Sequence, residues 1–161
     1  MTQEEKNLLL QDLCARVPYG VKILHTGWDY DSDTDFDTVE TFIGIDDKFI
    51  YTVWDKTGDR EKHCLSISNW KPYLRPISSM TDKEMDKLFD ILHIDKNGED
   101  EDWIKINDVL GIKFFFRTGK WIENVAEAYD YLNSIYIDYR GLIPMGLALE
   151  AQEGMYNIKE K

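Results

Sequence analysis

The chain has 161 residues, of which 43% are hydrophobic and 13% aromatic, and its formal net charge is -12. This length and composition suffice to bury a core without disulfides or a structural metal, so intrinsic disorder is excluded as the default. The 19 basic residues are scattered singly among 31 acidic ones. Such a charge distribution repels nucleic acid and anionic membrane surfaces, which disfavours both as direct partners.

The first residues and the cysteines indicate a cytoplasmic setting. The segment from Met1 to Lys6 is acidic where a signal peptide would be basic, and no run approaches the roughly 20 apolar residues of a membrane span. Cys14 and Cys64 fall in different predicted elements and lack metal-ligand spacing. We therefore expect a reduced cytoplasmic protein with no cofactor and no membrane segment.

A helix followed by strands is predicted for the first half. Leu9 and Leu13 recur at helical spacing within residues 3–16, and the pattern ends at Pro18. Runs of β-branched and aromatic residues then predict four strands, at residues 19–25, 39–45, 49–54 and 63–68. The short turns between them favour a small curled antiparallel sheet of the SH3-like kind in the strand-rich part, residues 19–70.

The junction between the two halves is a proline-containing segment, Trp70 to Met80. Pro72 and Pro76 forbid a helix and remove backbone donors, so the segment is predicted to run extended across the surface. Thr81 and Glu84 then form a T-x-x-E capping box, which predicts a helix that begins directly after Thr81.

The helix-rich part, residues 81–150, continues with a second helix. Asn124 and Glu127 form another capping box, and a strand is predicted before it at residues 111–117. The apolar, glycine-punctuated tail at 141–149 is expected to dock as a short helix or buried coil. With no internal repeat or linker in the sequence, we expect a single α+β domain over residues 1–161, in which the helices pack against the sheet.

Three segments carry a family resemblance: residues 13–22, 71–81 and 138–148. Together they resemble a group of small uncharacterised proteins encoded by gut Bacteroidales and by their phages and mobile elements. The resemblance implies a bacterial or phage origin and a cytoplasmic setting. It transfers no catalytic residue, because no activity is attached to the group.

Residues 29–40, of which 29–37 are predicted to form an acidic loop, contain the most suggestive metal-binding pattern. Counted from Asp29, carboxylates stand at positions 1, 3, 5, 7, 9 and 12 of an EF-hand-like loop. The candidate calcium ligands among them are Asp29, Asp31, Asp33, Asp35 and Glu40. Thr34 occupies the position where the sharp turn needs glycine, and the preceding residues are predicted to form a strand. A solvated acidic hairpin is the favoured interpretation, and calcium binding is the alternative.

The histidines and cysteines give no predicted site. His25, His63 and His93 could in principle join Cys14 or Cys64 in a metal site or a Cys-His nucleophile pair. Their spacing does not bring them together, and adjacent residues of a strand, such as His63 and Cys64, point to opposite faces. The sequence also lacks the nucleotide-binding glycine motifs and the serine-hydrolase elbow.

These observations favour a non-enzymatic protein-interaction module with an unidentified protein partner. Trp70, Tyr73 and Arg75 are its candidate contacts, because they lie in the proline-containing segment predicted at the surface. One alternative is an acidic inhibitor or DNA mimic, in which the net charge of -12 occupies a nucleic-acid-binding groove. An enzyme would instead require a pocket with converging titratable groups.

Overall fold

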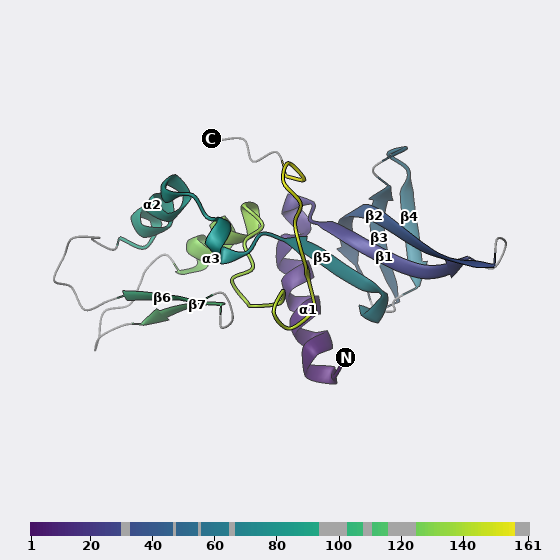
Figure 1. Cartoon of the computed structure of the whole chain (residues 1–161), viewed down its shortest axis with the longest axis horizontal. Coiled ribbons are helices and arrows are strands. Elements are labelled where there is room, and N and C mark those ends of the chain that lie inside the picture. Colours follow the sequence, from purple (N-terminus) through teal and green to yellow (C-terminus); the bar gives the residue numbers. More distant parts are fainter. Residues whose placement is uncertain are drawn as a thin grey trace.

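The computed structural model describes residues 1–29, 33–46, 48–54, 56–64, 67–93, 103–107, 111–115 and 125–156. A six-stranded sheet occupies one end of the molecule and a smaller group of helices with a two-stranded ribbon occupies the other (Figure 1). The helices are α1 (Gln3–Arg16), α2 (Asp82–Ile91) and α3 (Val125–Ser134). The long helix α1 runs across the middle of the molecule, between these two ends.

The large sheet has the strand order β4-β3-β2-β1-β5-β8, which combines antiparallel pairs with one parallel pair, β5 and β8. Its strands are β1 (Lys22–Asp29), β2 (Thr34–Ile45), β3 (Phe49–Trp54), β4 (Arg60–Cys64), β5 (Trp70–Leu74) and β8 (Leu149–Glu150). The predicted α+β class is confirmed. Among the described strands β4 and β8 form two edges, so the sheet is open and the SH3-like closure is not observed.

Helix α1 covers the sheet with its leucine face. The helix begins with a capping box between Thr2 and Glu5, and Leu9 and Leu13 are fully buried. These leucines belong to a core cluster that includes Ile23 and Phe42 from the sheet. The predicted first helix is confirmed, and its apolar spacing is what fixes the helix against the sheet.

The acidic segment forms part of a strand rather than only a loop. β2 begins at Thr34 and pairs with β1 from the start, with Asp35 opposite Trp28 and Asp37 opposite Thr26. Asp35 and Asp37 are exposed, whereas Phe36 between them is half-buried. The aspartates therefore occupy the outer face of an alternating strand, which is how a segment this acidic can pair.

The first part of the proline-containing segment forms a strand inside the sheet, whereas it was predicted to run across the surface. Trp70–Leu74 is strand β5, which lies inside the sheet between β1 and β8. Trp70, Pro72 and Leu74 alternate as buried residues, and Pro72 lies opposite Ile23 of β1. Only the residues after Leu74 leave the sheet, so Trp70–Leu74 is part of the core and does not run across the surface.

Helix α2 begins as predicted. The Thr81 hydroxyl accepts the backbone N–H of Glu84 at 3.2 Å, and the Glu84 carboxylate accepts the N–H of Thr81 at 2.8 Å. Glu84 also forms an ion pair with Arg75 at 2.7 Å, which ties the end of β5 to the first turn of α2. The cap therefore orients the whole second half relative to the sheet.

Replacement of Thr81 by alanine is expected to lower the free energy of unfolding by about 1 kcal/mol, because two amide groups of the first turn lose their fixed partners. Urea denaturation followed by tryptophan fluorescence measures this change. Thr81→Ser keeps the hydroxyl and should unfold like the wild type. An equal decrease in the free energy of unfolding for Thr81→Ala and Thr81→Ser would contradict a capping role.

The second half builds its own core cluster. Leu88 and Leu92 of α2 pack with Ala128 and Leu132 of α3. The ribbon of β6 (Trp103–Asn107) and β7 (Gly111–Phe115) confirms the strand predicted in this region. Asn124 of the second predicted capping box lies outside the described residues.

The C-terminal tail returns to the first cluster. Leu142, Leu147 and Ala148 are buried there, as expected for a docked tail. The Tyr156 hydroxyl accepts the N–H of Lys22 at 3.0 Å and donates to the carbonyl of Tyr73 at 2.7 Å. None of the described helices combines the length and the apolar composition that a bilayer-spanning helix needs.

Candidate functional site

The covered face of the sheet changes from apolar to polar along its strands. Ile23 on β1 and Phe42 on β2 are fully buried under α1, and Ile50 on β3 joins them in the core. Two residues further along these strands, on the same face, stand His25, Glu40 and Thr52. His63 of β4 lies opposite Ile50 and therefore shares this face. The polar cluster thus continues the hydrophobic core.

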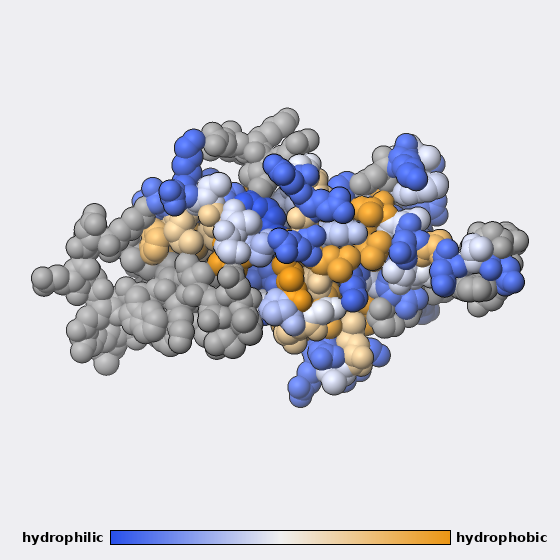
Figure 2. All heavy atoms as spheres, viewed as in Figure 1, coloured by the Kyte–Doolittle hydropathy of each residue, from blue (hydrophilic) through white to orange (hydrophobic). Residues whose placement is uncertain are grey.

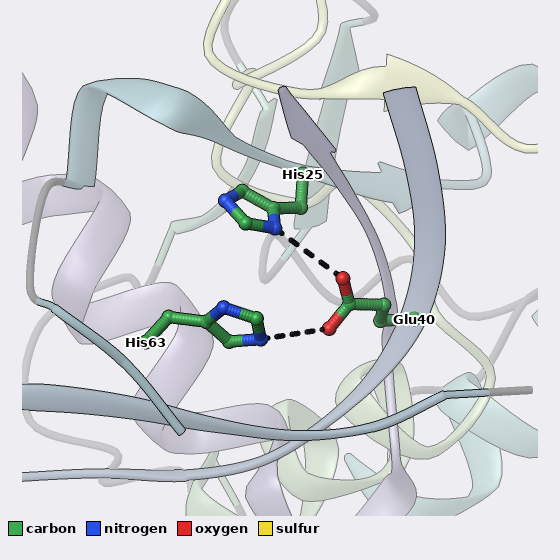
Figure 3. Close-up of side chains that lie close together, drawn as sticks. All are labelled: His25, Glu40 and His63. Carbon is green, nitrogen blue, oxygen red and sulfur yellow. Dashed lines mark hydrogen bonds and ion pairs between the residues drawn. The ribbon is translucent and has the colours of Figure 1, made fainter. Parts of the chain in front are cut away.

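Glu40 lies between the two histidines (Figure 3). Its Oε1 atom is 3.3 Å from Nδ1 of His25, and its Oε2 atom is 3.1 Å from Nε2 of His63. One ligand atom from each of the three side chains lies within 4.8 Å of the other two. The Glu40 side chain is 5% exposed, against 13% for His25 and 21% for His63.

Two threonine hydroxyls hold the carboxylate. Thr38 donates to Oε1 of Glu40 at 2.7 Å, and the buried Thr52 donates to Oε2. Each oxygen therefore receives one hydroxyl hydrogen bond and directs its remaining capacity toward an imidazole. This arrangement fixes the orientation of the carboxylate before any ligand arrives.

Aromatic rings hold His25 in place. Trp70 stacks on the His25 ring, with 3.7 Å between ring centroids and 10° between planes, and Phe36 meets it edge-on at 5.0 Å. A Cβ atom on Gly27 would lie 2.5 Å from the Phe36 ring, so a glycine is needed there for this ring position. The histidine therefore has a rigid apolar wall on one side.

The electrostatics keep Glu40 ionised. Burial raises the pKa of the Glu40 carboxyl, but hydrogen bonds from His25, Thr52 and Thr38 and the charge of His63 outweigh it. The net effect lowers the pKa from its ordinary value of 4.5 to about 2. The site accordingly presents a carboxylate at any physiological pH.

The lowered pKa makes a prediction about acid stability. Because the pKa of Glu40 is about 2 in the folded protein and 4.5 ordinarily, its stabilising effect is complete above pH 4.5 and is lost as the pH falls toward 2. The difference in unfolding free energy between the wild type and Glu40→Gln should shrink across this range. Urea denaturation at a series of pH values, with a chelator present, measures it. A difference that stays constant with pH would contradict the assignment.

Two imidazoles and a carboxylate form a 2-His-1-carboxylate donor set. The nitrogen–oxygen distances of 3.1 and 3.3 Å exceed the roughly 2.7–2.9 Å of charge-assisted N–H···O bonds. Two ligands that each lie about 2.0–2.1 Å from one tetrahedral metal ion are about 3.3 Å apart. The two contacts here join different oxygens of Glu40, and the three ligand atoms lie within 4.8 Å of one another. An ion shared by the three donors would therefore draw the imidazoles closer to one carboxylate oxygen.

Glu40 does not belong to the EF-hand-like pattern. It pairs with Ile23, six residues along β1 from Asp29, which at about 3.3 Å per residue places it roughly 20 Å from the end of the hairpin. Asp33 and Asp35 are exposed at that end. Asp31 and the side chain of Asp29 lie outside the described residues. The twelfth-position ligand of the calcium prediction is thus engaged elsewhere.

The predicted interaction residues are largely occupied within the fold. Trp70 is 1% exposed, so its prediction as a surface contact is wrong: the ring fills the core beside His25. Arg75 is half-buried and binds Glu84 and the carbonyl of Ser79. Tyr73 is half-buried and sits between the buried residues of β5.

The expectation that the histidines stay apart is wrong for two of them. His25 and His63 meet, with ring centroids 4.6 Å apart, and Glu40 joins them in place of a cysteine. Cys14 is exposed on α1, and His93 is exposed just beyond α2. The sequence did carry a signal for this meeting. His25 stands two residues after Ile23, and Glu40 stands two residues before Phe42, so strand alternation places both on the buried face of the sheet.

Comparisons with known proteins give no assignment: no family model, curated protein or solved structure matches the chain. The resemblance to Bacteroidales and phage proteins stays a prediction. Inference about function therefore starts from the geometry of the His25, Glu40 and His63 cluster.

Proposed function

We propose that this protein binds one divalent transition-metal ion, zinc or iron(II), through His25, Glu40 and His63. The observation that carries the proposal is the convergence of one ligand atom from each of His25, Glu40 and His63, all within 4.8 Å of one another. The three donors come from β1, β2 and β4, so the sheet itself sets their separation.

The donor types select the class of ion. Imidazole nitrogen suits zinc, iron, copper and nickel, whereas calcium takes six to eight oxygen ligands. Two neutral imidazoles and one carboxylate bring a single negative charge to a divalent ion, and the protein's net charge of -12 favours the approach of cations. Zinc and iron(II) both occur with this donor set.

Preorganisation supports the same function. Thr38 and Thr52 orient the Glu40 carboxylate, while Trp70 and Phe36 hold the His25 ring. Partners of this kind around metal ligands fix their direction and raise affinity.

The test is metal content and stoichiometry. Protein purified without added metal is analysed for bound elements by mass spectrometry, then stripped with a chelator and titrated with Zn²⁺ by calorimetry. We expect one bound ion per chain. A stripped wild type whose titration matches that of the double variant His25→Ala, His63→Ala would overturn the proposal and leave the cluster as a hydrogen-bonded core network.

As a second proposal, the exposed carboxylates of the β1–β2 hairpin support the acidic-inhibitor function. Asp33, Asp35 and Asp37 are all exposed, and the hairpin end of the molecule is hydrophilic on the face seen in Figure 2. Alternate residues of one strand form a row of negative charge that suits a basic groove of a protein partner. Partner proteins captured from the native host should then be released as the salt concentration rises. The triple variant Asp33→Asn, Asp35→Asn, Asp37→Asn should capture less of these partner proteins than the wild type.

A further inference from the structure

We infer that the ion held by His25, Glu40 and His63 keeps a coordination position that accepts a ligand from outside the protein. Water would fill it at rest, and a small anion or a carboxylate would replace that water. This inference rests on the proposed metal binding and concerns what the bound ion does there.

The three side chains supply fewer donor atoms than a metal ion takes. His25, Glu40 and His63 supply three, whereas zinc takes four ligands and iron(II) in a facial triad takes six. In zinc proteins, three protein ligands with a fourth position for water or substrate are typical of catalytic sites. The donor set therefore belongs to the class that exchanges ligands.

Of the three side chains, the two histidines are the more exposed to solvent. Glu40 is 5% exposed and forms the floor of the site, while His25 and His63 are 13% and 21% exposed. The Thr38 and Thr52 hydroxyls are turned toward the carboxylate oxygens of Glu40. An ion between these side chains is consequently approached from the histidine side, where solvent reaches the rings.

The aromatic ring beside the two histidines favours a small anion as the outside ligand. Trp70 lies against both histidines. The distance between ring centroids is 3.7 Å to His25 and 4.9 Å to His63. This apolar wall lowers the local dielectric and so strengthens the attraction between the ion and a small anion. Azide and acetate are suitable probes, because each offers a single small anionic donor group.

Cobalt(II) gives a direct test, because it substitutes for zinc or iron(II) and its visible absorption reports the ligands around it. The stripped full-length protein is loaded with one equivalent of Co²⁺ and titrated first with azide and then, in a separate sample, with acetate. We expect saturable changes in the visible bands with either anion. Co²⁺ in buffer without protein, titrated identically, corrects for free metal.

The outcomes separate the two proposals. Failure of Co²⁺ and Zn²⁺ to bind would remove the metal site itself. Tight binding of Co²⁺ with a spectrum that neither azide nor acetate alters would retain the metal site and overturn the exchangeable position. A response that persists in His93→Ala but disappears in His63→Ala would place the exchange at the triad, and one that survives in His63→Ala would place it elsewhere and contradict the inference.

Discussion

Replacement of His63 by alanine is expected to reduce the affinity for Zn²⁺ by more than about 100-fold, because removal even of an outer partner of a metal ligand costs about 10-fold to 100-fold. His63 contributes one of three donor atoms and is the only contribution from β4 to the triad. Calorimetric titration of the stripped protein measures the change. Thr52→Val removes a hydroxyl that orients Glu40. The Zn²⁺ affinity of this variant should lie between the affinities of the wild type and of His63→Ala.

The matched control is His93→Ala. His93 is an exposed histidine beyond the end of α2, in the other half of the molecule, and its replacement should leave Zn²⁺ affinity unchanged. Equal losses for His93→Ala and His63→Ala would point to non-specific binding by histidine side chains. Retention of full affinity in His63→Ala would remove β4 from the site.

Stability gives an independent readout of the same site. At a free Zn²⁺ concentration 100 times the dissociation constant, binding to the folded state should raise the unfolding free energy by about 2.7 kcal/mol. The increase should be absent in His63→Ala. Because His63 lies on the edge strand β4, hydrogen exchange in β4 should slow on metal binding more than exchange in α2.

The local elements could be predicted from the sequence because their signals are local. Thr81 and Glu84 stand three residues apart and satisfy each other's backbone amides, so the start of α2 depends on nothing distant. The hairpin of β2 and β3 follows likewise from two β-rich runs around a short turn. Each of these elements is determined within about a dozen residues.

The candidate site could not be predicted in the same way. His25 and Glu40 are separated by 15 residues and Glu40 and His63 by 23, so their meeting depends on strand order and register. β5 was predicted to be an extended surface segment, because proline is usually avoided inside sheets. Pro72 is accommodated opposite Ile23, and the neighbouring Trp70 then becomes the wall of the site instead of a surface contact.

A second large effect is expected at a buried ion pair that joins the two halves. Arg16 and Asp12 of α1 are both fully buried, with Nε of Arg16 2.7 Å from Oδ2 of Asp12. Arg16 also donates to the carbonyl of Ile137 at 2.9 Å. Ile137 belongs to the α2–α3 core cluster, whereas α1 packs on the sheet. The guanidinium therefore connects the two clusters through one side chain.

Arg16→Leu is expected to lower the free energy of unfolding by about 3–5 kcal/mol, because it leaves the Asp12 carboxylate buried without its main partner. Such a loss is a large part of the roughly 5–15 kcal/mol that stabilises a domain. Urea denaturation measures it. Arg60→Leu, at an exposed arginine of β4, is the matched control and should change stability by no more than about 0.5 kcal/mol.

The double variant Asp12→Leu, Arg16→Leu distinguishes a charge left unpaired from lost packing. It removes both buried charges, so we expect it to be more stable than Arg16→Leu alone. Arg140 approaches Asp12 at 3.3 Å and is 27% exposed, so it can turn to solvent once Asp12 is gone. Asp138 adds to the effect: burial raises its pKa and the nearby charge of Asp12 raises it further, while Arg16 opposes this. Loss of Arg16 alone thus removes the positive charge that offsets both buried acidic groups, Asp12 and Asp138. A double variant less stable than Arg16→Leu would show that the pair acts through packing instead.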